Sequence, residues 1–249
     1  MPKNPQNIGS VLRASGNFGV RDVVLVSPRA DVREEIVSTV ACGSPARLTT
    51  VESLEDALAD SSVSLAFSRR KGKGRPALRS LDAFLRVDRD ASSGWVTQQG
   101  TLALVFGREE SGLEAHEIML CSHTVEIPSE PSFPSLNLSH AVAVILSQLF
   151  EYSYASNFVE EGGDRGGEAP ATHAELTALF KRVTGMLERQ GLDMSESKGG
   201  GDSGSHGRRI RAPGHLKSAL LKGGLSQAEC RSLFGLVKEL EKTLEVSEE

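Results

Sequence analysis

Residues Leu102–Ala141 read LALVFGREESGLEAHEIMLCSHTVEIPSEPSFPSLNLSHA and carry the clearest structural pattern in this chain. Two apolar runs of strand character, Leu102–Phe106 and Val125–Ile127, each end in a turn rich in glycine, serine or proline. Ligands of open α/β sheets bind outside the carboxyl ends of the parallel strands. The two turns are therefore predicted to form parts of one binding site.

The same alternation of strand-like and helical patterns extends over residues 1–158. Such alternation predicts an α/β domain in which helices cover the faces of a parallel sheet. The further strand-like runs are Val23–Val26 and Val63–Phe67, and the helical patterns are Asp31–Thr39, Leu54–Leu58 and Leu138–Tyr154.

Residues 159–171 are polar and glycine-rich, which predicts a linker, and residues 172–249 are helical in pattern. Thr172 with Glu175, and Ser226 with Glu229, have the spacing of capping boxes at two helix starts. Between these helices, residues 195–207 predict a flexible Gly/Ser-rich loop. The amphipathic helices of this extension should pack together or against a partner subunit.

Composition excludes several classes of protein. The chain has 249 residues, of which 39% are hydrophobic and 24% charged, as in an ordinary globular protein. It contains no apolar run of about 18 residues, so no membrane span is expected, and its start lacks a signal-peptide core. Cys42, Cys121 and Cys230 are isolated and predict buried thiols in a reducing compartment.

The net charge of −5 argues against bulk electrostatic coating of nucleic acid. Two segments without acids nevertheless stand out, one around Arg70, Lys71 and Lys73, and one that holds Arg208, Arg209 and Arg211, named here the C-terminal arginine cluster. A charge run is ordinarily a solvated loop. Glycines between the cations favour a loop that can follow phosphates. Beside the motifs described next, we prefer RNA contact to a solvated loop for both segments.

A third element, Asn7–Gly19, lies near the N-terminus. Together the three elements resemble the motifs of the SpoU (TrmH-type) branch of the SPOUT RNA methyltransferases. Arg108 and the helical extension make the chain most similar to TrmJ-like tRNA ribose methyltransferases. The first motif is matched by Asn7, Gly9, Arg13, Phe18 and Gly19, the second by Phe106, Gly107, Glu109, Gly112 and Leu113, and the third by Ile127, Pro128, Ser135, Leu136 and Asn137.

The resemblance implies a SPOUT-type parallel sheet flanked by helices, a C-terminal trefoil knot in the catalytic domain, and a homodimer. It implies transfer of a methyl group from S-adenosylmethionine to a ribose 2′-hydroxyl, with tRNA as the expected substrate. The family also has a strand before its first motif, whereas only residues 1–6 precede Asn7 here. Either the chain is a truncated gene product or that strand is missing.

Site residues also follow from the resemblance. Backbone groups would hold the cofactor, since glycine permits close approach, and Arg13 would be the central catalytic residue. Because arginine is essentially always protonated, we expect Arg13 to clamp an RNA phosphate and stabilise developing alkoxide charge. Asn7 has the alternative role of an N-cap on the helix that carries Arg13, and Glu109 that of a turn carboxylate. The cofactor-binding residues are Phe67, Ser68, Arg69, Gly107, Ile127, Leu136 and Asn137, and the catalytic residues are Arg13, Asn7, Glu109, Ser135 and Asn137.

Other chemistries fit less well. Gly107 and Gly112 lack the Lys-Ser/Thr of a P-loop, Ser139 and His140 lack a nucleophile elbow, and the histidines have no metal-ligand spacing. Two alternatives stay open: methylation of rRNA, and a non-catalytic RNA-binding protein that retains the fold. The expected location is cytoplasmic, or organellar if an upstream targeting segment is missing.

Overall fold

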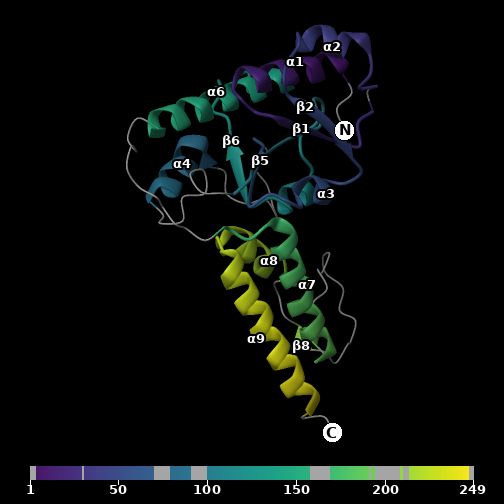
Figure 1. Ribbon diagram of the computed structural model, residues 1–249, viewed down its shortest axis with the longest axis vertical. Helices are drawn as coiled ribbons and strands as arrows, with labels where there is room; N and C mark the ends of the chain where they lie inside the picture. The colour runs from purple at the N-terminus through teal and green to yellow at the C-terminus, as the bar shows by residue number, and fades with distance from the viewer. Residues whose placement is uncertain are drawn as a thin grey trace. The chain divides into compact units, whose positions relative to one another are not determined.

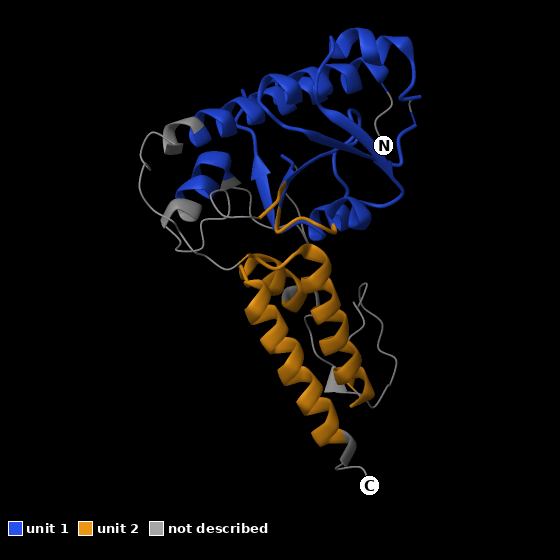
Figure 2. Ribbon diagram, in the orientation of Figure 1, with its two compact units in different colours: residues 1–58, 64–92, 103–166 blue, residues 59–63, 93–102, 167–249 orange. Residues whose placement is uncertain are grey.

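The computed structural model describes residues 4–29, 31–69, 79–90, 100–157, 169–190, 192–193, 208–209 and 213–246. These residues divide into two compact units (Figure 2). Unit 1 comprises residues 1–58, 64–92 and 103–166, and unit 2 comprises residues 59–63, 93–102 and 167–249.

Unit 1 holds the predicted parallel strands, distributed over two sheets. β1 (Asp22–Val26) pairs in parallel with β2 (Arg47–Val51), from Asp22 opposite Arg47 to Val26 opposite Val51. The second sheet has the order β4-β6-β3-β5, and β6 pairs in parallel with both β3 and β4. Its strands are β3 (Val63–Phe67), β4 (Arg79–Ser80), β5 (Leu102–Phe106) and β6 (His123–Glu126).

Helices cover both faces of the second sheet because successive side chains of a strand point to opposite faces, and those of β5 are apolar throughout. In β5, Leu104 and Phe106 pack towards α1 and α6, whereas Val105 packs with the segments around α3 and α5. α1 also packs against α2, and Figure 1 shows α1 and α6 side by side. The helices of unit 1 are α1 (Pro5–Asn17), α2 (Glu35–Ala41), α3 (Leu54–Leu58), α4 (Leu81–Asp90), α5 (Ala115–Met119) and α6 (Leu138–Asn157).

Unit 2 is built on three helices with their own apolar core. Leu176 and Leu179 of α7, Leu221 of α8 and Cys230 and Val237 of α9 are all buried together, and each fully buried leucine contributes about 1.5–3 kcal/mol. The elements are α7 (His173–Arg189), β7 (Leu192–Asp193), β8 (Arg208–Arg209), α8 (Pro213–Lys222) and α9 (Gln227–Val246).

Unit 2 also includes two short segments from the N-terminal half of the chain, residues 59–63 and 93–102. The backbone N–H groups of His173 and Ala174 donate to the carbonyl oxygens of Ser61 and Ala59, at 2.7 and 3.1 Å. These bonds satisfy donors at the start of α7 that have no partner within the helix.

The predicted capping boxes at the starts of two helices were confirmed. Both capping boxes form: Thr172 N–H donates to the Glu175 carboxylate at 2.7 Å, and Ser226 N–H to that of Glu229 at 2.8 Å. The N-cap role suggested for Asn7 is wrong, because Asn4 caps α1 by accepting from Gln6 N–H at 2.9 Å. The predicted loop 195–207 lies outside the described residues, and the trefoil knot stays a prediction.

Candidate functional site

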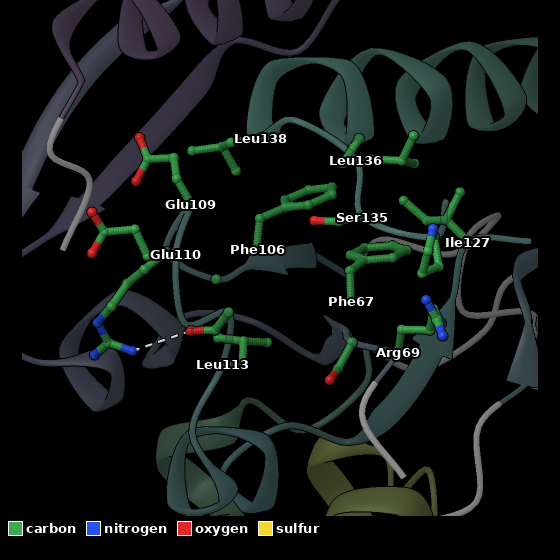
Figure 3. A pocket seen from close by; sticks show the side chains of 16 residues that line it. Phe67, Arg69, Phe106, Glu109, Glu110, Leu113, Ile127, Ser135, Leu136 and Leu138 are labelled. Atoms are coloured by element: carbon green, nitrogen blue, oxygen red, sulfur yellow. Dashed lines mark hydrogen bonds between the residues drawn. The ribbon is translucent and has the colours of Figure 1, made fainter. Parts of the chain in front are cut away.

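One cavity of about 420 Å³ lies where the loops after β3, β5 and β6 meet. Its volume is in the range that suits a ligand the size of a nucleoside derivative. Figure 3 shows Phe67 and Phe106 in its middle, Glu109 and Glu110 on one side, and Arg69 on the other. Its lining includes Phe67, Ser68, Arg69, Gly107, Glu109, Ile127, Ser135 and Leu136, all predicted from the sequence.

The second-motif turn is closed by its own backbone. Arg108 N–H donates to Gly112 O at 3.3 Å, Gly112 N–H donates to Arg108 O at 2.9 Å, and Gly112 has a φ of 65°. A Cβ on Gly107 would lie 2.2 Å from the carbonyl carbon of Gly112 and 2.3 Å from Leu113 N. Glycine at position 107 is therefore required by the turn itself, before any ligand is considered.

A bidentate ion pair fixes this turn to α5. Arg108 donates from Nη1 and Nη2 to the two carboxylate oxygens of Glu117, at 2.9 and 2.8 Å, and the two side chains are only 20% and 15% exposed. Burial pushes the pKa of Glu117 upwards, but the bonds from Arg108 and from Glu114 N–H outweigh it and lower that pKa. The hydrogen bonds to Glu117 raise the pKa of Arg108. Both side chains are therefore charged at neutral pH.

Asn7, Glu109 and Asn137 form a hydrogen-bonded chain that joins the three motifs. Asn7 Nδ2 donates to Glu109 Oε1 at 3.0 Å, and Asn137 Nδ2 donates to Asn7 Oδ1 at 3.2 Å. Asn137 Oδ1 in turn accepts from Ser139 N–H at 2.8 Å, as an N-cap of α6 does. Asn7 is 7% exposed, and its amide is bonded to a residue of each of the two other motifs. The Asn7 amide therefore positions these motifs relative to each other.

Phe67 stacks on Phe106, with ring centroids 4.6 Å apart and planes 11° apart. The aromatic side chain of Phe67 is accommodated because Phe106 offers a parallel face at the end of the neighbouring strand. The pair forms an apolar wall of the cavity.

Arg13 is not brought into this cavity. It lies on the exposed side of α1, away from the buried residues of the helix, and its guanidinium makes no hydrogen bond or ion pair with the described residues. Arg70, Lys71, Lys73 and Arg211 lie outside the described residues. Arg208 and Arg209 are described only as the backbone of β8.

The sequence analysis did not identify Glu117 as a site residue, although Glu114 and Glu117 are three positions apart, which is the spacing of a capping box. Glu114 and Glu117 form a capping box at the start of α5, and the cationic partner is Arg108, which the sequence marked only as a point of resemblance. Cys121 and Cys230 are buried as predicted, but the prediction of a buried Cys42 is wrong, since this residue is exposed at the C-cap of α2. No cluster of described side chains could hold a metal ion.

Residues 1–147, more than half of the chain, match the model of the SpoU rRNA Methylase family. The chain belongs to the SpoU family. This SpoU chain is 33% identical to an uncharacterised tRNA/rRNA methyltransferase of Haemophilus influenzae over 98% of its own length and 92% of that protein.

Two TrmJ proteins are also similar. The tRNA (cytidine/uridine/adenosine-2′-O-)-methyltransferase TrmJ of Pseudomonas aeruginosa is 36% identical, over 57% of this SpoU chain and 54% of that protein. The crystal structure of TrmJ from Z. mobilis ZM4 matches with a TM-score of 0.68 and 26% identity over 96% of both chains. The expected SPOUT-type fold and TrmJ-like resemblance are confirmed.

Proposed function

We propose that this protein transfers a methyl group from S-adenosylmethionine to a ribose 2′-hydroxyl of RNA, and that the RNA is tRNA. The observation that supports this most strongly is the hydrogen-bonded chain Asn7–Glu109–Asn137, which joins all three motifs. Glu109 also lines the 420 Å³ cavity. The names of the TrmJ relatives support the tRNA substrate.

The cavity suits this cofactor chemically. Glu109 and Glu110 face Arg69 across it, so it offers negative and positive charge to a ligand that carries an ammonium group and a carboxylate. The Phe67–Phe106 wall and Ile127 offer apolar surface to an adenine ring. When bound, S-adenosylmethionine supplies a methyl group activated by the positive charge on sulfur. The side chains mainly have to orient the two reactants.

The described residues suggest how the site is organised. The Arg108–Glu117 pair holds the second-motif turn, and Asn7 sets the position of Glu109 and Asn137. Ser135 and Asn137 would bind substrate or cofactor through neutral groups. Arg13, which is always protonated, would clamp a phosphate and stabilise the developing alkoxide while the proton passes to water.

We propose that the protein acts as a homodimer. The exposed position of Arg13, outside the cavity of its own chain, supports this, because a second copy could bring the guanidinium to a reaction site. Light scattering should give twice the mass of the chain. Mixing inactive Arg13→Lys subunits with inactive Asn137→Ala subunits should restore part of the activity, and a monomeric, active protein would contradict the proposal.

No described helix has the length and hydropathy needed to cross a membrane. A cytoplasmic location is part of the proposal.

Mass mapping of ribose methylation in total RNA, from cells with and without the gene, tests the proposed function. Loss of one 2′-O-methyl group in tRNA is the expected result. The matching family is that of the SpoU rRNA methylases, and a site lost from rRNA instead would assign that substrate. Unchanged methylation together with intact RNA binding would mean a non-catalytic RNA-binding protein and would overturn the proposal.

A further inference from the structure

Phe133 is exposed to an unusual degree. Its side chain is 81% exposed, the highest value among the large apolar side chains that the structure describes. It lies in the loop between β6 and α6, within the third motif. A phenylalanine held in water forgoes the stabilisation that burial would give it.

The loop holds Phe133 in place. Phe133 N–H donates to Glu130 O at 3.0 Å, and Ser129 Oγ donates to Pro134 O at 3.1 Å. Pro131 and Pro134 flank the turn and restrict its φ angles. The backbone that carries the aromatic ring is therefore held in a hydrogen-bonded turn, so little backbone entropy remains to be lost when a ligand covers the ring.

The position of Phe133 indicates what would cover it. The next three residues, Pro134, Ser135 and Leu136, line the cavity assigned to the cofactor. A ribose that reacts there must bring its own base to the rim of the cavity. Unstacked bases of RNA are recognised by stacking on aromatic side chains.

We infer that Phe133 is a substrate-binding residue on which an unpaired nucleobase of the RNA stacks, beside the ribose that is methylated. The inference rests on the proposed function, because it takes the neighbouring cavity to be the methyl-donor site. Stacking on phenylalanine requires a flat π-face and tolerates any base. Phe133 would therefore add affinity for unpaired RNA without choosing the base.

Three substitutions separate stacking from simple apolar contact. Phe133→Tyr keeps the aromatic face, Phe133→Leu keeps apolar bulk, and Phe133→Ala removes both. A control is Phe150→Leu, which changes a half-exposed phenylalanine on α6 whose ring contacts Phe18 and which does not line the cavity. Bulk tRNA from cells that lack the gene serves as the methylation substrate, and single-stranded oligouridylate and an RNA duplex of equal length serve as binding probes.

We expect Phe133→Leu and Phe133→Ala to raise KM for bulk tRNA, and Kd for oligouridylate, by about 5- to 150-fold, the range found when a stacking side chain is removed. Phe133→Tyr and Phe150→Leu should match the parent protein in both assays. The Kd for S-adenosylmethionine, kcat and binding of the duplex should not change, because these do not require an unstacked base.

Parent-like values for Phe133→Leu would overturn the inference, since leucine has no π-face. A lower oligomeric mass of the Leu and Ala variants would also overturn it, by placing Phe133 between two copies of the chain. If the parent protein methylated no RNA, the proposed function would fail by itself. The oligouridylate measurement would still decide the role of Phe133, because it requires no turnover.

Discussion

Replacement of Arg108 by methionine should loosen the second-motif turn and weaken cofactor binding. Methionine keeps most of the length of the side chain but removes three hydrogen bonds, one to Gly112 O at 3.3 Å and two to the Glu117 carboxylate at 2.9 and 2.8 Å. It also leaves the Glu117 carboxylate, which is 15% exposed, with little beyond the 2.7 Å bond from Glu114 N–H.

The loss of stability in Arg108→Met is set mainly by the two charged hydrogen bonds to Glu117. Each hydrogen bond to a charged group contributes about 1.5–3 kcal/mol, and breaking a buried ion pair costs about 3–5 kcal/mol. Because both side chains retain some contact with water, we expect a loss of about 3 kcal/mol in the free energy of unfolding of the catalytic unit. A distorted turn should also weaken S-adenosylmethionine binding by about tenfold or more, which is about 1.4 kcal/mol.

Urea unfolding and titration calorimetry measure the two effects. Arg86→Met is the matched control, because the Arg86–Asp82 pair is 77% and 71% exposed and solvent screens it. A double-mutant cycle with Glu117→Gln should give a coupling of about 2 kcal/mol. Equal losses for Arg108→Met and Arg86→Met, or additive effects in the cycle, would refute the assignment of Arg108–Glu117 as the clamp of the turn.

The pH dependence of the Arg108–Glu117 pair has a definite sign. Folding lowers the pKa of Glu117 below its ordinary value of 4.5, so the carboxylate form is favoured in the folded state. The contribution of the Glu117 carboxylate to the stability of the fold is fully present above the ordinary pKa of 4.5, and it is lost as the pH falls through the lowered pKa of the folded state. The stability difference between the parent protein and Glu117→Gln should therefore shrink in acid, and a difference that grows in acid would contradict this assignment.

Four further outcomes are expected. Gly107→Ala should abolish S-adenosylmethionine binding in calorimetry, because its Cβ would meet the Gly112–Leu113 backbone, whereas Gly185→Ala, with 3.7 Å to its nearest neighbour, should stabilise α7 by about 0.5–1 kcal/mol. Arg13→Lys should keep cofactor binding and lose most methyl transfer, since lysine lacks the planar fork; normal turnover would make this arginine dispensable. Neutralising the C-terminal arginine cluster should flatten the plot of log affinity for RNA against log salt by up to about 0.9 for each duplex phosphate that the protein no longer binds; an unchanged slope would remove the cluster from the RNA site. Cys42 should be the first thiol of the native protein to react with a maleimide, because burial raises the pKa of Cys121 to about 12; mass spectrometry of the labelled protein would show otherwise if Cys121 reacted first.

The sequence alone determined the features that depend on neighbouring residues. β3 and β5 have the bounds that their apolar runs predicted, whereas β6 begins two residues earlier and ends one residue earlier than expected. The capping boxes at Thr172 and Ser226 form because each joins residues three positions apart. The motif turns could likewise be recognised, since glycine, proline and serine act on the backbone locally.

Tertiary structure decided which of these groups meet. Asn7 reaches Glu109 and Asn137 across 102 and 130 positions of sequence, a contact that exists only once α1 packs beside α6. The same packing turns Arg13 to the exposed side of the helix, although it belongs to the same motif as Asn7. The pattern of residues determines which side of a helix or strand is apolar. Which other element packs against that side depends on the order of the strands and on the helices that cover them.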